Sequence, residues 1–173
     1  QELGVMLHDA LDLCTDGPAA IRWSKTAAPS VPDHEVGSGL RARKVRDGRD
    51  VCILAVGKLL GAARDAAEAL AAEGIEATVW DVRVVPLDPE MLADAARHTV
   101  VVTAEDGVRE GGVGSMIAGS LARIDGAVPR VRVLGTPTEF IPHGKPDQIL
   151  ADLGLDGAGL AAEVRAALAS LQT

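Results

Sequence analysis

VCILAVGKLLGAARDAAEALAAEG, residues 51–74, is the stretch that decides the fold. Its first six residues, 51–56, are all apolar and lack the polar alternation of a half-exposed strand, so they predict a strand covered on both faces. An alanine-rich segment at 59–74 follows and predicts a helix, with Gly74 placed where a helix ends. A buried strand that leads directly into a helix is the repeating unit of parallel α/β sheets.

The same unit recurs along the chain. Asp88 followed by Pro89 predicts the start of another helix, because an aspartate caps the first turn and proline fits the first helical position. We expect further strands at 76–85, 99–105 and 128–135, and further helices at 89–98, 116–124, 146–154 and 159–171. Right-handed crossovers then give a mostly parallel sheet with helices on both faces, a three-layer α/β/α fold.

The first 49 residues have a different pattern. They predict one helix at 2–13, one short strand at 18–24 and a tract rich in proline and glycine. One helix and one strand cannot build a core, so we expect 1–26 to be the C-terminal end of a preceding domain, 27–49 a linker and 50–173 the α/β domain. Because the first residue is Gln1, we expect the sequence to begin inside a longer polypeptide.

Composition narrows the class of protein. Hydrophobic residues make up 47% of the 173 residues and aromatics 2%, so the core must be aliphatic. A formal charge of −8 argues against a nucleic-acid or anionic-membrane surface, and no apolar run reaches the roughly 18–20 residues of a membrane span. Cys14 and Cys52 stand far apart without a zinc-binding pattern, which fits a reduced protein in the cytoplasm.

Several motifs occur together in one order. They are DGPAAIRWSK (16–25), DVCILAVGKLL (50–60), TVWDVRVVPLDPEML (78–92), HTVVVTAEDGVREGGVGS (98–115), VPRVRVLGTPTEFIPHG (128–144) and ILADLGLDGAGL (149–160). In this order they resemble the C-terminal portion of the 1-deoxy-D-xylulose-5-phosphate synthases, within the transketolase family. The resemblance implies that residues 1–26 end a pyrimidine-binding domain and that 50–173 form a transketolase C-terminal domain.

The resemblance also implies a reaction, cofactors and partners. These synthases transfer a two-carbon unit from pyruvate to glyceraldehyde 3-phosphate with loss of carbon dioxide, for isoprenoid-precursor and thiamine biosynthesis, using thiamine diphosphate and Mg²⁺. The sequence holds no G-D-G…N cofactor motif, so the cofactor ligands are expected outside this chain, which we expect to be inactive alone. A homodimer, or a partner chain with the cofactor domains, is implied. Transketolase itself, a 2-oxo-acid dehydrogenase β-like protein and a non-catalytic assembly or regulatory module remain open.

Arg83 is the leading candidate binding residue. It lies near the end of the second predicted α/β strand, at the edge where such sheets bind ligands, and its guanidinium matches phosphate oxygens. An ion pair with Asp81 or Asp88 is the alternative interpretation. The resemblance places Arg22 in the matching position of the preceding domain, so the two arginines would hold the acceptor phosphate, with Lys25 as a lesser contributor.

The neighbourhood of Arg22 departs from the family pattern R-Y/F-P-R/K-G. Ser24 and Thr26 stand where proline and glycine are usual, which alters the expected backbone and leaves open a divergent paralogue. His143 lies in the loop FIPHG and could touch substrate or cofactor phosphate, or lie at a subunit contact.

Two further features favour structural roles. The glycines of the 107–115 turn are expected to permit a tight turn and close helix packing rather than to bind an anion. Glu105 and Asp106 are adjacent on a strand and therefore point to opposite faces, which rules out an acid/base pair. The four histidines are dispersed, so we expect no catalytic triad and no metal cluster.

Overall fold

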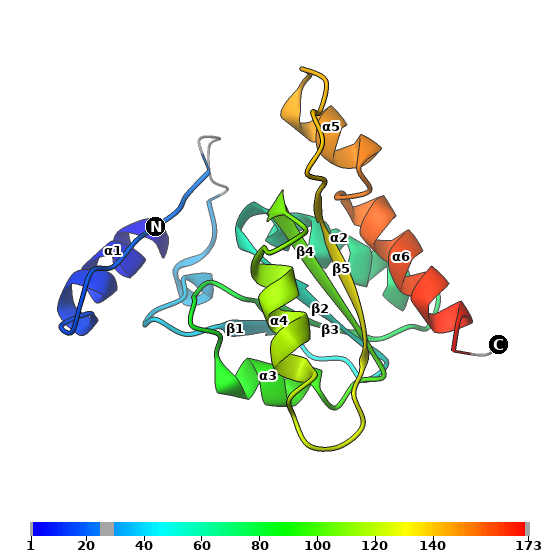
Figure 1. The fold of residues 1–173 in the computed structure, drawn as a ribbon, viewed down its shortest axis with the longest axis horizontal. Coiled ribbons are helices and arrows are strands. Elements are labelled where there is room, and N and C mark those ends of the chain that lie inside the picture. The colour runs from blue at the N-terminus through cyan, green and yellow to red at the C-terminus, as the bar shows by residue number, and fades with distance from the viewer. Residues whose placement is uncertain (1, 25–29, 172–173) are drawn as a thin grey trace.

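The computed structural model describes residues 2–24 and 30–171, and Figure 1 shows their arrangement. Among these residues a five-stranded sheet has the order β1-β3-β2-β4-β5. Strands β3, β2, β4 and β5 are parallel to one another, and β1 pairs with β3 antiparallel. The strands are β1 Arg43–Arg46, β2 Val51–Ala55, β3 Ala77–Asp81, β4 Val100–Val108 and β5 Arg130–Thr136.

Helices cover both faces of this sheet, which confirms the predicted three-layer α/β/α fold. On one face α2 (Leu60–Ala71) and α6 (Gly157–Ala169) pack over the strands, and on the other α3 (Pro89–Ala95) and α4 (Val113–Leu121) do so. Figure 1 shows α4 in front of the strands. A short helix, α5 (Pro146–Asp152), follows β5 and precedes α6.

The helix ends follow the signals in the sequence. The Asp88 carboxylate accepts a hydrogen bond from the Glu90 N–H at 2.9 Å and caps α3, as predicted. Gly74 has a φ of +84°, and the N–H of Ile75 returns to the carbonyl of Leu70 at 3.0 Å after α2. This left-handed closure after a helix favours glycine, so the sequence correctly indicated where α2 ends.

Some predicted boundaries were wrong. Strand β1 lies inside the segment expected to be a linker, and residues 18–24 form no strand. The strand predicted at 76–85 ends at Asp81, because the chain turns sharply at Arg83. Helix α4 begins at Val113, three residues before the predicted start. The domain boundaries at 26 and 50 stay a prediction.

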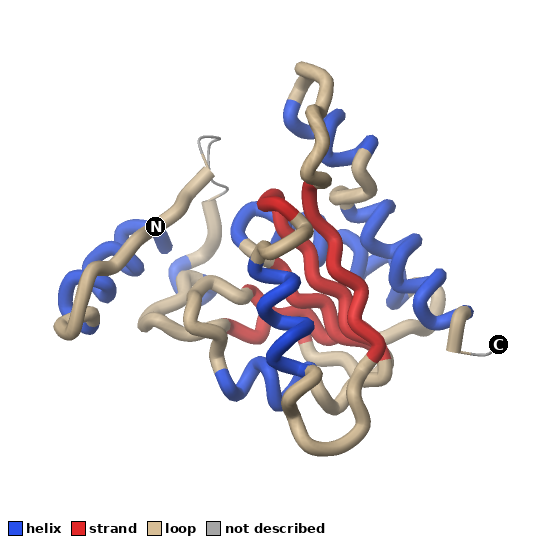
Figure 2. Tube along the Cα trace, viewed as in Figure 1, coloured by secondary structure: helices blue, strands red, loops and turns tan. Residues whose placement is uncertain are grey.

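Helix α1 (Glu2–Leu13) lies apart from the sheet, as Figure 2 shows. Ala10 is its one buried residue, while four leucines are exposed: Leu3, Leu7, Leu11 and Leu13. The Asp9 carboxylate accepts a hydrogen bond from the N–H of Gly39 at 2.7 Å. The helix is therefore attached to the rest of the chain by polar contacts more than by a shared apolar core.

No helix within 2–24 or 30–171 combines the length and the hydropathy that crossing a bilayer requires.

Candidate functional site

The carboxyl ends of the parallel strands form the candidate site. The chain passes from β2 to β3 on one side of the sheet, and β4 lies on the other side of β2. The end of β2 is therefore a topological switch point, where open α/β sheets place their ligands. The segments after β2 and β3 carry Lys58 and Arg83 to this edge, and the last part of β4 carries Asp106 there.

The backbone of Arg83 adopts an unusual conformation for a residue that is not glycine. Its φ of +55° lies in the left-handed region, and the N–H of Val84 bonds back to the carbonyl of Val82 at 2.6 Å. A non-glycine residue in this conformation costs about 1–3 kcal/mol, and such residues cluster at active sites and ligand clamps. The turn aims the arginine side chain into the junction between β3 and the segment before β1.

The Arg83 guanidinium is buried and largely engaged by the protein itself. Its side chain is 3% exposed, and Nε donates to the Glu2 carboxylate at 2.5 Å. Nη1 donates to the carbonyl oxygens of Gly39 at 3.2 Å and Arg41 at 2.6 Å, whereas the buried Nη2 has no hydrogen-bond partner among the described residues. A Cβ on Gly37 would lie 2.7 Å from Glu2 Oε1, so glycine permits this close packing.

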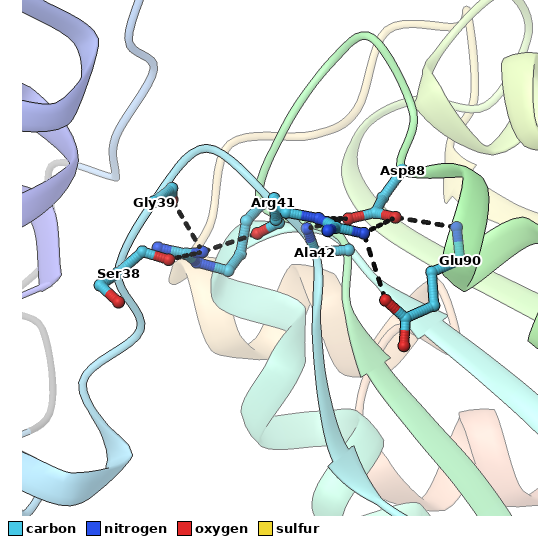
Figure 3. Close-up of polar contacts among 7 residues, drawn as sticks. Ser38, Gly39, Arg41, Ala42, Asp88 and Glu90 are labelled. Carbon is cyan, nitrogen blue, oxygen red and sulfur yellow. Dashed lines mark hydrogen bonds and ion pairs between the residues drawn. The ribbon is translucent and has the colours of Figure 1, made fainter. Parts of the chain in front are cut away.

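Glu2 was not predicted to contribute, nor was the loop that holds Arg83. Arg41 in this loop donates two hydrogen bonds to Asp88, at 3.0 and 3.1 Å, and one to Glu90 at 3.2 Å. Figure 3 shows these bonds joining the loop to the start of α3. Asp88 thus pairs with Arg41, while Arg83 pairs with Glu2 from α1, 81 residues away in sequence.

Asp81, at the end of β3, completes a buried group of charges. Burial, together with repulsion from Glu2, raises the pKa of its carboxyl to about 6. The guanidinium of Arg43 lies 3.7 Å from Asp81 and 3.8 Å from Glu2, and with Arg83 it opposes this rise. Two carboxylates, of Glu2 and Asp81, and two guanidiniums, of Arg43 and Arg83, therefore lie together in a largely buried cluster.

Arg22 lies in a second cluster at the same edge. Its Nη1 donates to Asp106 Oδ1 at 3.1 Å, and Lys58 Nζ lies 3.8 Å from Oδ2 of the same carboxylate. The Arg22 side chain is 71% exposed, in contrast to the buried Arg83. The two arginines thus lie in separate ion-pair clusters, and their joint hold on one phosphate stays a prediction.

The other predicted contacts are less defined. Lys25 lies outside the described residues, and His143 is exposed in the loop between β5 and α5. Lys58 was overlooked in the sequence, although it closely follows the strand predicted at 51–56, and α/β sheets bind their ligands at the carboxyl ends of their strands.

The glycine-rich turn has the structural role predicted for it. The buried Glu105 carboxylate accepts hydrogen bonds from the N–H groups of Val113 at 3.2 Å and Gly114 at 2.8 Å. A Cβ at Gly114 would lie 2.8 Å from a methyl carbon of Val133. The positive end of α4 is therefore occupied by the protein's own carboxylate, and glycine is needed for close packing.

Residues 40–160 match the family described as "Transketolase, C-terminal domain". A 1-deoxy-D-xylulose-5-phosphate synthase of Anaeromyxobacter dehalogenans (strain 2CP-1 / ATCC BAA-258) is 44% identical, over 95% of this chain and 27% of that protein. Synthase 1 of Geobacter sulfurreducens (strain ATCC 51573 / DSM 12127 / PCA) is 41% identical, over 98% of this chain and 27% of that protein. The chain thus spans about a quarter of the length of these relatives.

Solved structures share the fold. A chain described as "Split gene transketolase, inactive beta4 tetramer" superposes with a TM-score of 0.84 at 32% identity, over 95% of this chain and 54% of that one. A transketolase mutant from Pichia Stipitis gives a TM-score of 0.58 at 17% identity, over 77% of this chain and 18% of that one, which is a likeness of fold alone.

Proposed function

Because this chain belongs to the transketolase C-terminal domain family, we propose that it is the C-terminal portion of a transketolase-type transferase, specifically a 1-deoxy-D-xylulose-5-phosphate synthase. The observation that carries the proposal is identity of 41–44% to two such synthases across nearly the whole chain. The complete enzyme would condense pyruvate with glyceraldehyde 3-phosphate and release carbon dioxide. Its product would supply isoprenoid-precursor and thiamine biosynthesis in the cytoplasm.

The proposed cofactors do not fit the residues at hand. Within the described part of the chain, no three carboxylate, thiol or imidazole side chains lie together as ligands for Mg²⁺. We therefore derive no chemical step through thiamine diphosphate or its metal from these residues, and the role proposed for this portion is substrate binding and domain contact.

Arg22 and Arg83 are the residues proposed to hold the acceptor phosphate. Three properties of Arg83 support its part: the carboxyl-edge position, the left-handed backbone and a buried Nη2 with an unused donor. Arg22 supports the other half because it reaches the same edge and is open to solvent. The Glu2 carboxylate that now contacts Arg83 is an anion of the kind that a phosphate group would replace or join.

Assembly with a second chain forms part of the proposal. The similar split-gene transketolase is described as an inactive tetramer of beta chains. By analogy, this portion acts within a homodimer or together with a partner chain that carries the cofactor domains. A non-catalytic assembly module is the second candidate, favoured by the same "inactive" description.

One assay tests the proposal. The complete protein that contains this sequence, supplied with thiamine diphosphate, Mg²⁺, pyruvate and glyceraldehyde 3-phosphate, should form 1-deoxy-D-xylulose 5-phosphate and carbon dioxide in equal amounts. Transfer from a ketose phosphate without carbon dioxide release would instead identify a transketolase. No turnover with either donor, with the cofactors and any partner chain present, would support the assembly module.

A further inference from the structure

Lys58 lies at the ligand edge of the sheet with no role assigned to it. It follows β2 within the short 3-10 helix η2 (Gly57–Leu59), at the switch point between β3 and β4. Gly57 has a φ of +59°, a left-handed conformation that favours glycine, and the N–H of Val56 bonds to the Ala104 carbonyl at 2.9 Å. The turn is thus fixed against β4, and Lys58 with it.

Two cations meet one carboxylate at this point. Arg22 Nη1 lies 3.1 Å from Asp106 Oδ1, and Lys58 Nζ lies 3.8 Å from Oδ2 of the same carboxylate. The local balance is therefore one positive charge in excess, in a chain whose formal net charge is −8. The three side chains are 71%, 26% and 16% exposed for Arg22, Lys58 and Asp106, so a dissolved anion can reach all of them.

We propose that Lys58 and Arg22 form the solvent-facing part of a phosphate-binding site, and that Asp106 holds the two cations together until phosphate displaces it. This inference rests on the proposed function for the identity of the phosphate ester, but not for the binding of phosphate itself. Arg83, at 3% exposure, belongs to the buried part of the edge.

The chemistry favours exchange of the carboxylate for phosphate. A phosphate monoester carries a charge of about −1.5 to −2 at pH 7 and three strong acceptor oxygens, whereas a carboxylate carries −1 and two oxygens. One phosphate can therefore accept from the Lys58 ammonium and the Arg22 guanidinium together. Asp106 then remains beside the phosphate and repels it, so its charge should limit the affinity.

Titration of the 173-residue chain with inorganic phosphate by isothermal calorimetry tests the site. Lys58→Gln should weaken phosphate binding about 10-fold, the effect of losing one charge-assisted hydrogen bond, while Lys58→Arg should retain it. Asp106→Asn should tighten binding about fivefold, the effect of removing one like charge about 4 Å away in water. Arg109→Gln is the matched control, because Arg109 is an exposed cation after β4 that pairs with Glu110 instead.

Circular dichroism of each variant confirms that it is folded before titration. Equal phosphate affinity in the wild type, Lys58→Gln and Asp106→Asn would overturn the inference, as would the absence of any phosphate binding by the wild type. Equal losses in Lys58→Gln and Arg109→Gln would also overturn it, because they would indicate only a general charge effect.

A second measurement separates this inference from the proposed function. If the complete protein is a synthase, Lys58→Gln should raise KM for glyceraldehyde 3-phosphate about 10-fold and leave KM for unphosphorylated glyceraldehyde unchanged. If the complete protein forms no deoxyxylulose phosphate while Lys58→Gln still weakens phosphate binding by the chain, the proposed function fails and the site stands. An active synthase with an unchanged KM in Lys58→Gln would overturn the site and leave the function intact.

Discussion

The substitution Glu2→Gln should release helix α1 from the domain while leaving the sheet intact. Glutamine keeps the shape of the side chain but removes the charge that lies 2.5 Å from Arg83 Nε and 3.8 Å from Arg43 Nη2. The Arg83 side chain, 3% exposed, would keep its charge and lose the one carboxylate that lies within ion-pair distance among the residues that the structure describes.

The size of the effect follows from burial. Breaking a fully buried ion pair costs about 3–5 kcal/mol, but the Glu2 side chain is 25% exposed and Asp81 can take over part of its role, so we expect about 2–3 kcal/mol. Because Ala10 is the one buried residue of α1, the helix can detach without opening the core. The loss should therefore appear as local rather than global unfolding.

Native-state hydrogen exchange measures this directly. Amides of α1 should exchange about 30- to 160-fold faster in Glu2→Gln, because a loss of about 2–3 kcal/mol raises the equilibrium constant for opening of the helix by that factor. Amides of β2 and β4 should keep their rates. Asp12→Asn, an exposed charge change on the same helix, is the control and should change neither group. Unchanged α1 exchange in Glu2→Gln, or equal acceleration throughout the sheet, would refute the account of Arg83 as the anchor of α1.

Three further outcomes follow from the described contacts. Because the pKa of Asp81 is raised from 3.8 to about 6 in the native state, the native protein binds an extra proton, and stability should fall by about 3 kcal/mol as pH rises from about 4 to 6. The urea-denaturation midpoints at pH 4.5 and pH 7.5 measure this fall, and Asp81→Asn should reduce the difference between them. A difference as large as that of the wild type would contradict this. Gly114→Ala places a methyl group 2.8 Å from a valine methyl carbon on β5 and should destabilise by about 1–3 kcal/mol, whereas Gly119→Ala, with open space on the same helix, should stabilise by about 0.5–1 kcal/mol in the same denaturation assay. In the native protein a thiol reagent should modify the exposed Cys14 alone, because burial raises the pKa of Cys52 and excludes the reagent; rapid native labelling of both would show that the sheet opens.

Much of the fold could be predicted because its signals are local. The apolar run at 51–56 and the Asp88 cap each determine their own element through side chains within a few residues. Strand β1 was missed because its sequence, RKVR, is polar, and its pairing with β3 depends on residues more than 30 positions away. The strand predicted at 18–24 was wrong, because among the described residues no strand pairs with this segment.

The candidate site could be predicted only in part. The position of Arg83 at the strand end follows from the α/β pattern, and the structure places it there. Its burial beneath Glu2 could not be read from the sequence, because the two residues are 81 positions apart and meet only when α1 docks. The contacts of Arg22 and Lys58 with Asp106 likewise could not be read from the sequence, because they depend on how three distant segments come together at the carboxyl edge of the sheet.

The most direct test of the phosphate-binding account is the KM of the complete protein carrying Arg22→Gln. The exposed position of Arg22 makes this change compatible with folding. Loss of one charge-assisted hydrogen bond should raise KM for glyceraldehyde 3-phosphate roughly 10- to 150-fold, with KM for unphosphorylated glyceraldehyde unchanged. A KM for glyceraldehyde 3-phosphate equal to that of the wild type, in a folded and active variant, would contradict the account.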